Sequence, residues 1–142
     1  MKREFKLITL FVFALAYITW GCSDQVAPVP EIAGNYEIVS VNGQPLPAVL
    51  NRSGGVTTTL VSGSLIADIL GSYTTDDVEQ NTSPSGTTVT FSESGGRYVS
   101  SGSGNYGLTD THGNGIGLVF LVGDTLSGLL DGRHYTWVRP PQ

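Results

Sequence analysis

The chain has 142 residues, with seven Lys and Arg against twelve Asp and Glu, so its formal net charge at pH 7 is −5. Proteins that hold nucleic acid by its phosphate backbone depend on clustered Lys and Arg, and this acidic chain has few of either. Its single cysteine excludes an internal disulfide and a zinc site built on paired cysteines.

The first 21 residues are typical of a secretory signal peptide. A basic start, residues 1–6, precedes the uncharged apolar run 7–20, which ends at Gly21. A membrane-spanning helix needs about 20 apolar residues, and the polar pair Ser23-Asp24 follows this shorter run directly. We therefore expect residues 1–21 to be removed on export rather than kept as a spanning anchor.

Removal of the signal peptide makes the chain more acidic. It takes away three of the seven basic residues, both lysines among them, and one of the twelve acidic residues, so the net charge becomes −7. Such a chain is repelled by nucleic acid and by anionic lipid surfaces. The loss of every lysine also excludes Schiff-base and P-loop chemistry.

Cys22 stands at the polar edge of the apolar run, directly after Gly21, and this placement resembles the lipobox of bacterial lipoproteins. The resemblance implies that the Cys22 thiol receives a diacylglycerol, that the chain is cut before it, and that the new amino terminus is acylated. Several acyl chains, at about 0.8 kcal/mol per buried methylene, give stable anchoring. Ser23 in the next position implies sorting to the outer membrane of a two-membrane bacterium. A plain signal peptide with an incidental cysteine is the alternative.

Residues 22–31 are predicted to be the lipidated cysteine and a flexible tether. The sequence "SDQVAPVP", residues 23–30, combines polar, small and proline residues and has no apolar period. The remaining residues 32–142 suit one domain.

This domain is predicted to be all-β, because short β-branched runs alternate with glycine and no stretch has helical periodicity. The predicted strands are 34–41, 56–62, 64–70, 72–79, 87–93, 96–101, 104–109, 116–122, 125–131 and 133–139. A glycine bend at 100–104 merges two of them in one interpretation, which leaves eight to ten strands.

The short connections predict an antiparallel meander of about eight strands closed into a small barrel, because closure removes exposed sheet edges. A two-layer β-sandwich is the alternative, and its longer crossings would be residues 42–55 and 81–86. The segment 44–50, "QPLPAVL", contains two prolines and several apolar residues, so we expect it to cover an apolar face rather than to form a regular central strand.

Four predicted strands open with the pattern glycine, any residue, tyrosine. Glycine lets a strand bend while a neighbouring ring covers the gap, so these rings are expected to pack at the rim or in the core of a barrel, where they are also candidate ligand-binding residues. The four tyrosines are Tyr36, Tyr73, Tyr98 and Tyr106, and Phe120 and Trp137 complete the candidate apolar lining.

The pair Gly123-Asp124 predicts a tight hairpin turn in which Val122 faces Thr125 and Leu121 faces Leu126. Both faces of this hairpin are apolar, so one is the interior and the other is covered or forms an interaction surface. One face carries Val119, Leu121, Leu126 and Leu130, and the other carries Ile116, Leu118, Phe120, Val122 and Leu129.

Over residues 32–139 the chain resembles the small lipocalin-like (calycin-type) barrel domains of bacterial secreted proteins. The resemblance is carried by the opening Gly34-Asn35-Tyr36, the run "SVNGQPLP" at 40–47, a glycine-rich meander, and the last strand "HYTWVR", which ends at Arg139. In lipocalins a late arginine packs across an aromatic ring of the first strand and closes the barrel floor. The resemblance assigns this role to Tyr36 and Arg139, a cation–ring contact worth about 0.5 to 2 kcal/mol.

No catalytic motif is present, and we expect neither catalysis nor a cofactor or metal. His112 and His134 lie in different elements. Asp77 and Glu79 share one strand face, which could serve acid–base chemistry, but a solvated outer face is the stronger interpretation. Residues 110–115, "DTHGNG", resemble the start of a calcium loop without its final glutamate, so a turn built from Asp, Asn and Gly is favoured.

Two functions follow from the sequence. The first is a membrane-anchored envelope lipoprotein that binds a small apolar molecule in its barrel. The second is a non-catalytic structural or protein-interaction module with a solid core and an apolar outer face at Val119, Leu121 and Leu126. In both, the membrane contact is made through the lipid on Cys22, and no protein partner is identified.

Overall fold

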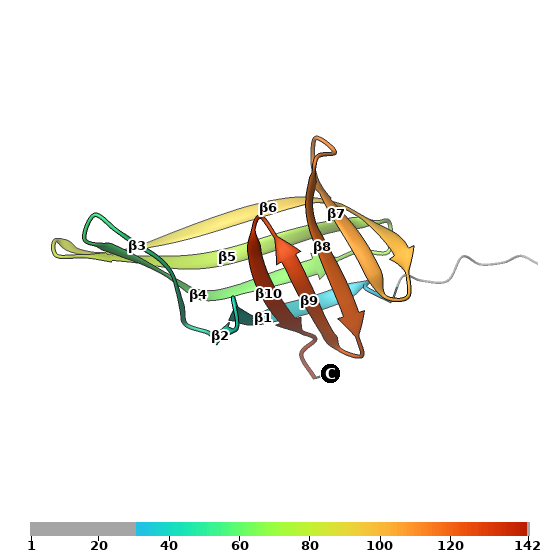
Figure 1. Cartoon of the computed structure of the whole chain (residues 1–142), viewed down its shortest axis with the longest axis horizontal. Coiled ribbons are helices and arrows are strands. Elements are labelled where there is room, and N and C mark those ends of the chain that lie inside the picture. Colours follow the sequence, from blue (N-terminus) through green and yellow to red (C-terminus); the bar gives the residue numbers. More distant parts are fainter. Residues whose placement is uncertain (1–30, 142) are drawn as a thin grey trace, which may run out of the picture.

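The computed structural model describes residues 31–141, which form ten strands and no helix (Figure 1). The predicted signal peptide, Cys22 and the tether up to Pro30 lie outside the described residues. Within residues 31–141, no helix is long and apolar enough to cross a membrane.

The ten strands follow one another with short connections, as the β-branched runs and glycines predict. Their bounds are β1 Gly34–Val41, β2 Gln44–Pro45, β3 Ala48–Ser53, β4 Val56–Ala67, β5 Ser72–Ser83, β6 Gly86–Gly102, β7 Asn105–Asp110, β8 Gly115–Val122, β9 Thr125–Leu130 and β10 Arg133–Val138.

The strands form one antiparallel sheet that closes on itself. Its order is β2-β1-β10-β9-β8-β7-β6-β5-β4-β3, and an additional pairing of β1 with β4 joins the two sides. Closure uses only the first half of β1, where Gly34 pairs with Ala67 and Glu37 pairs with Ser64. Eight strands therefore make a closed barrel, with β2 and β3 as additions. The predicted meander barrel is confirmed in preference to the two-layer sandwich.

Three strands are several residues longer than the sequence predicts: β5 continues to Ser83 beyond its predicted end at residue 79, and β4 and β6 each combine two predicted strands. The predicted strands 56–62 and 64–70 are one strand, β4, which has a bulge between Leu60 and Ser62 and ends at Ala67 rather than at residue 70. The predicted strands 87–93 and 96–101 are likewise one strand, β6. The merger predicted at 100–104 is wrong, because Ser103 and Gly104 both have positive φ and form the turn between β6 and β7.

Gly96 is a point of close approach rather than a turn. A methyl group on its Cα would overlap the carbonyl oxygen of Thr109 on β7. β6 therefore runs straight through the pair Gly95-Gly96 and pairs with both neighbours there, Gly96 with Tyr73 of β5 and with Asp110 of β7. Glycine at this position permits tight packing of the barrel wall.

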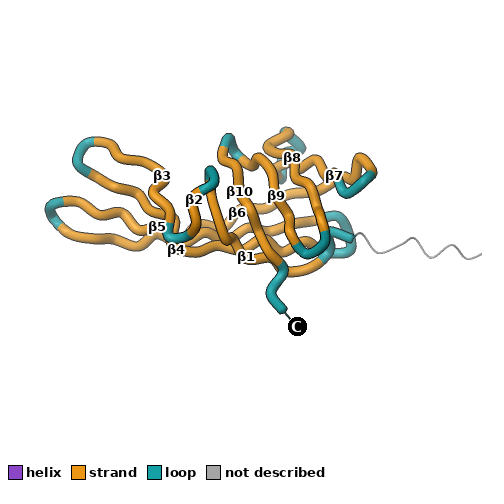
Figure 2. Tube along the Cα trace, turned by 60° about the horizontal axis from the view of Figure 1, so that its bottom comes forward, coloured by secondary structure: helices purple, strands orange, loops and turns teal. Residues whose placement is uncertain are grey.

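A flat arm extends from the barrel (Figures 1 and 2). We define the arm as β3 with residues 56–62 of β4, 78–83 of β5 and 86–91 of β6, which pair side by side with one bulge in the β3–β4 ladder and one in the β4–β5 ladder. The segment 44–50, expected to be only a cover, contributes both the short strand β2 and the start of β3. Leu46 and Leu50 of this segment do pack against the core, as expected from their apolar character.

The described chain begins at the end of the barrel that lies away from the arm (Figure 1). Gly34 pairs with Ala67 at one end of β4, whereas the arm begins at Val56 at its other end. At about 3.3 Å per residue these ends of β4 are roughly 36 Å apart. We call the end that holds residues 31–34 and the turn 68–71 the entry end.

Candidate functional site

The interior of the barrel is filled by aromatic side chains. Tyr98 and Tyr106 meet edge to face with ring centroids 5.9 Å apart, and Tyr135 stacks on Trp137 at 5.1 Å. Large aliphatic side chains occupy the space between the rings. The fully buried members of this core are Ile32, Tyr36, Val41, Leu60, Leu65, Leu108, Val119, Leu126 and Trp137.

The structure brings together five of the six candidate ligand-binding residues. Tyr36, Tyr73, Tyr98, Tyr106 and Trp137 are all buried in one core cluster. Phe120 is not among them, because it lies on the outer face of β8 and is 43% exposed. As members of the hydrophobic core, these rings have the packing role that the glycine and tyrosine pattern predicts.

Arg139 covers the first-strand ring at the entry end. Its guanidinium carbon lies 5.0 Å from the centroid of the Tyr36 ring, and its Nη2 donates to the Tyr36 hydroxyl at 2.6 Å. The Tyr36 hydroxyl in turn donates to the carbonyl of Ile32 at 3.0 Å. Burial raises the pKa of Tyr36, and the neighbouring guanidinium opposes that rise. The contact implied by the lipocalin resemblance is therefore present.

A polar cluster lies where the arm leaves the barrel. Asp77 and Glu79 share the inner face of β5 with buried Tyr73 and Thr75, so the interpretation of this face as solvated and outward is wrong. Burial is the main reason that the pKa of Asp77 rises from 3.8 to about 6, with the charge of Glu79 adding to the rise. Arg133 reaches across from β10 and places Nη1 3.5 Å from Oε1 of Glu79.

No direct signal in the sequence indicates that Asp77 faces inward. The Gly-x-Tyr pattern does place Tyr73 inward, and strand alternation from Tyr73 puts Asp77 on the same face. Arg133 is the opposite charge for both Asp77 and Glu79, and the Glu79 side chain is partly exposed.

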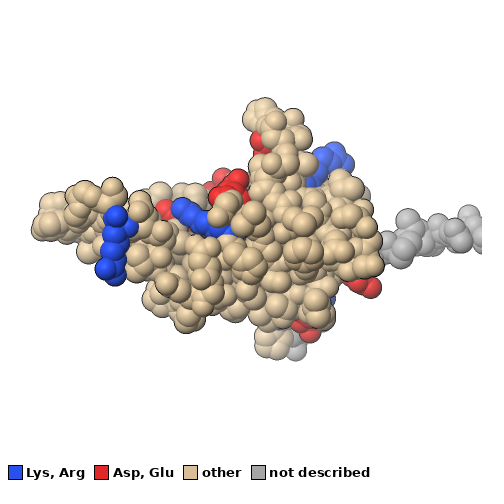
Figure 3. Space-filling model, in the orientation of Figure 1, with Lys and Arg blue, Asp and Glu red and all other residues tan. Residues whose placement is uncertain are grey.

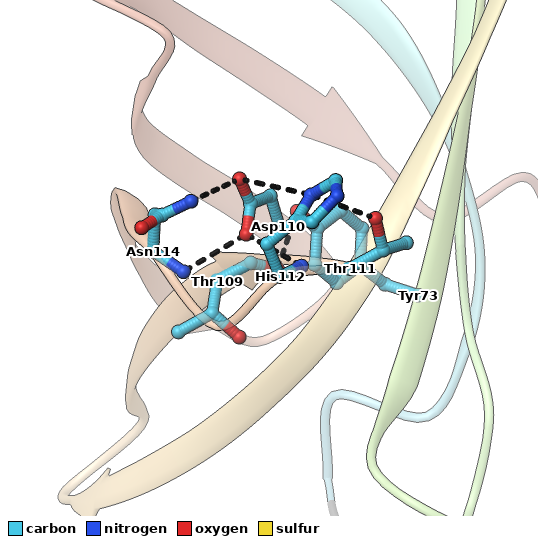
Figure 4. A network of polar contacts seen from close by, with 6 residues as sticks. All are labelled: Tyr73, Thr109, Asp110, Thr111, His112 and Asn114. Carbon is cyan, nitrogen blue, oxygen red and sulfur yellow. Dashed lines mark hydrogen bonds and ion pairs between the residues drawn. The ribbon is translucent and has the colours of Figure 1, made fainter.

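The β7–β8 turn is organised by one carboxylate (Figure 4). Asp110 accepts the backbone N–H groups of His112 and Asn114 at 2.8 Å, and Nδ2 of Asn114 at 2.8 Å. These bonds, the Asn114 side chain first, lower the pKa of Asp110. The predicted turn of Asp, Asn and Gly is confirmed. Between residues 31 and 141 no group of three or more His, Cys, Asp or Glu side chains is arranged to hold a metal ion.

The β8–β9 hairpin has the predicted register, with Val122 opposite Thr125 and Leu121 opposite Leu126. The face expected from the sequence to be an outer interaction surface is in fact the inner face of the hairpin. Val119 and Leu126 are fully buried in the barrel and Leu121 packs against the core, so they cannot form an outer surface. The exposed apolar side chains of this hairpin are Leu118, Phe120, Val122 and Leu129.

A cleft of about 520 Å³ opens on the outside of the barrel, where β1 leaves β4. β1 pairs with β4 only as far as Glu37, while β4 continues into the arm, so the two strands separate at this point. Leu46, Val61 and Val78 give the cleft an apolar wall. Its open shape does not enclose a ligand as the interior of a lipocalin does.

The arm has two free edges, and they differ. The edge formed by β3 is interrupted by a bulge between Val49 and Asn51 and carries the charge of Arg52. The edge formed by β6 is free from Gly86 to Gly95, since pairing with β7 begins only at Gly96, and no bulge interrupts the pairing of β6 with β5. Figure 3 shows that the arm carries few charged side chains on the face in view.

Comparison with protein-family models, curated proteins and solved structures finds no match to this chain.

The alternation of hydrogen bonds along β6 identifies the groups at its free edge. The N–H of Tyr98 donates to the carbonyl of Gly71, on the β5 side, at 2.9 Å. No bulge interrupts the pairing of β5 with β6, so the even-numbered residues of β6 bond to β5. The odd-numbered residues Val89, Phe91 and Glu93 therefore direct their N–H and C=O groups to the open side, where the arm can accept another strand.

Proposed function

We propose that this protein is an exported bacterial lipoprotein of the lipocalin-like class, held at the cell envelope by a lipid on Cys22. In this proposal the barrel is a solid scaffold without catalytic activity, and the arm binds an extended segment of a protein partner. The membrane concerned is the outer membrane of a two-membrane bacterium, as the residue after Cys22 implies. The unprotected β6 edge, on an arm that projects from a filled barrel, is the observation that carries the proposal.

The packing of the barrel favours this function over carriage of a small apolar molecule. A carrier of the lipocalin type needs an apolar cavity inside its barrel. Here two of the tyrosines that would line such a cavity, Tyr98 and Tyr106, pack against each other, and Trp137 stacks on Tyr135. The side chains proposed as a lining therefore supply the core.

The β6 edge lacks the features that usually prevent edge-to-edge pairing. Proteins protect free edges with lysine, proline, inward charges or bulges. Residues 87–95, "TTVTFSESG", contain no lysine or proline, and Glu93 is their only charge. The β3 edge of the same arm does have a bulge and Arg52. This difference favours β6 as a surface kept open for pairing.

The side chains beside the edge suit an apolar partner strand. Phe91 is 77% exposed and Val89 is 54% exposed, and both lie on the outer face of the arm. Phe91 stands opposite Val78 on β5, which continues the apolar surface inward. A strand added to this edge would gain main-chain hydrogen bonds and would bury these side chains, the mode of recognition known as β-augmentation.

The experiment compares Val89→Pro with Val89→Thr in the full chain. Proline removes the N–H that faces the open side without removing a bond to β5, whereas threonine keeps that N–H and removes only apolar surface. With a photo-reactive residue in place of Phe91, cross-linking in a producing bacterium should yield a partner adduct for the parent and for Val89→Thr. The adduct should fall at least tenfold for Val89→Pro.

Equal cross-linking of Val89→Pro and the parent would reject strand addition at this edge. Thermal unfolding of both variants checks that the barrel is intact. An apolar molecule retained one to one by the purified chain in native mass spectrometry would instead favour the carrier function.

A further inference from the structure

The side chains most exposed to solvent among the large hydrophobics gather at the entry end. Five such side chains in the described chain are more than 60% exposed: Ile69, Leu70, Phe91, Val99 and Val122. Ile69 and Leu70 form the tip of the β4–β5 turn, and Val122 begins the β8–β9 turn at the same end. Only Phe91 belongs to the region of the arm. Tight turns are usually built from polar residues and glycine, so the pair Ile69-Leu70 is unusual.

Several hydrogen bonds order the β4–β5 turn that carries this pair. The Asp68 carboxylate accepts the N–H of Leu70 at 2.8 Å and the N–H of Ser72 at 2.9 Å, and the Asp68 N–H donates to the carbonyl of Ser72. The Tyr98 hydroxyl, reaching from β6, donates to the carbonyl of Asp68. Ile69 and Leu70 are therefore presented by a turn that is ordered by hydrogen bonds from both of its sides.

The entry point of the chain lies beside this turn. Ala67, the last residue of β4 before the turn, pairs with Gly34 at the start of β1. Nη2 of Arg139 donates to the carbonyl of Glu31 at 3.0 Å and holds the incoming chain against the same end. Eight residues lie between Cys22 and Glu31, so nine residue steps, at most about 32 Å of extended chain, join the two. A lipid on Cys22 would keep the entry end within that distance of a bilayer.

We propose that the β4–β5 turn is a second membrane contact, in which Ile69 and Leu70 enter the surface layer of the bilayer that holds the lipid on Cys22. This inference rests on the proposed lipid anchor and adds an orientation to it. Apolar side chains at a membrane surface contribute by burial and do not require anionic lipid. The net charge of −7 after export disfavours an anionic surface, so zwitterionic lipid is the partner. The entry end then faces the membrane and the arm points away from it.

The test places tryptophan at two sites of matched exposure in the full exported chain. Leu70→Trp reports on the turn, since Leu70 is 78% exposed, and Phe91→Trp is the control on the arm, since Phe91 is 77% exposed. Each variant is reconstituted into phosphatidylcholine vesicles with and without brominated acyl chains, which quench tryptophan inside the bilayer. The unvaried chain corrects for buried Trp137. We expect quenching of Leu70→Trp to exceed that of Phe91→Trp at least threefold.

Mass spectrometry of Cys22 separates failure of the contact from failure of the anchor. If Cys22 carries lipid and the vesicles carry the protein, equal quenching of the two variants overturns the contact and leaves the anchor standing. If Cys22 carries no lipid, the anchor is wrong, and the contact stands only if Leu70→Trp is still the more strongly quenched variant. Absence of that difference overturns both.

A further variant distinguishes a membrane contact from a protein contact. Ile69→Ser with Leu70→Ser should shorten the time the lipidated chain stays on vesicles by at least threefold, without changing its sedimentation in solution. If the double variant instead converts an assembled form into a monomer, the turn is a contact between copies and the membrane proposal is overturned.

Discussion

Arg139 and Tyr36, 103 residues apart in sequence, close the entry end of the barrel by direct contact of their side chains. The guanidinium lies over the ring, donates to the hydroxyl, and also donates to the carbonyls of Glu31 and Ala33. Arg139, which directly follows β10, therefore joins β1 to the residues that precede it.

Arg139→Ala should lower the free energy of unfolding by about 2 kcal/mol, because it removes a ring contact and several charge-assisted hydrogen bonds. Tyr36→Phe should cost about 1 kcal/mol through loss of the hydroxyl bonds. In the double variant the two losses should be less than additive by roughly 1 kcal/mol. Urea denaturation of the four proteins measures this coupling. Strict additivity would show that the contact contributes nothing.

Asp77 makes stability depend on pH. Its folded pKa of about 6 lies above its ordinary 3.8, so folding favours the protonated carboxyl. The stabilising contribution is complete below about pH 4 and is lost as the pH rises through 6. Asp77→Asn should therefore stabilise the protein at pH 8 by about 1 kcal/mol, a figure reduced for screening of a partly exposed group, and the advantage should vanish at pH 4.

Unfolding curves at pH 4 and pH 8 test this expectation. Asp76→Asn is the matched control, because Asp76 is the preceding residue on the exposed face, and it should change stability by less than about 0.5 kcal/mol. A destabilising effect of Asp77→Asn at pH 8 would mean that the ionised carboxylate is held favourably by Arg133.

Gly96 should tolerate no side chain. Gly96→Ala places a methyl group against the carbonyl of Thr109 and should cost about 2 to 4 kcal/mol. Gly107→Ala is the control within the barrel wall, since a methyl group there meets no atom within 4 Å. It should be neutral or stabilising by up to about 0.5 kcal/mol. Equal effects of the two substitutions in thermal unfolding would show that Gly96 does not lie against the carbonyl of Thr109.

The sequence predicts the architecture well because its signals are local. Period-two alternation and glycine turns locate most strands, and the pair Gly123-Asp124 sets the correct register of the β8–β9 hairpin. The lipocalin resemblance pairs Tyr36 with Arg139, a contact that no local pattern could indicate. These features depend on short-range chemistry or on one recurring family arrangement.

The remaining features depend on which neighbours the strands meet. β8 and β9 are apolar on both faces, so nothing within the hairpin decides that Val119 is buried and Phe120 exposed. In the sequence, Gly96 suggests a break between two strands. In the sheet, its lack of a side chain lets the backbone of β7 approach closely. The arm arises because β4, β5 and β6 continue beyond the points where β1 pairs with β4 and β7 pairs with β6. Only the complete topology of the sheet reveals this extension.

The most direct test of a solid barrel is calorimetric titration of the chain with benzene and with a long-chain fatty acid, beside Leu108→Ala as a positive control. Leu108 is fully buried, and its truncation should cost about 3 kcal/mol and leave an apolar cavity that accepts benzene. A solid barrel predicts saturable binding of benzene to Leu108→Ala and no one-to-one binding of either probe to the parent chain. One-to-one binding by the parent, weakened by Tyr106→Ala inside the barrel, would contradict it.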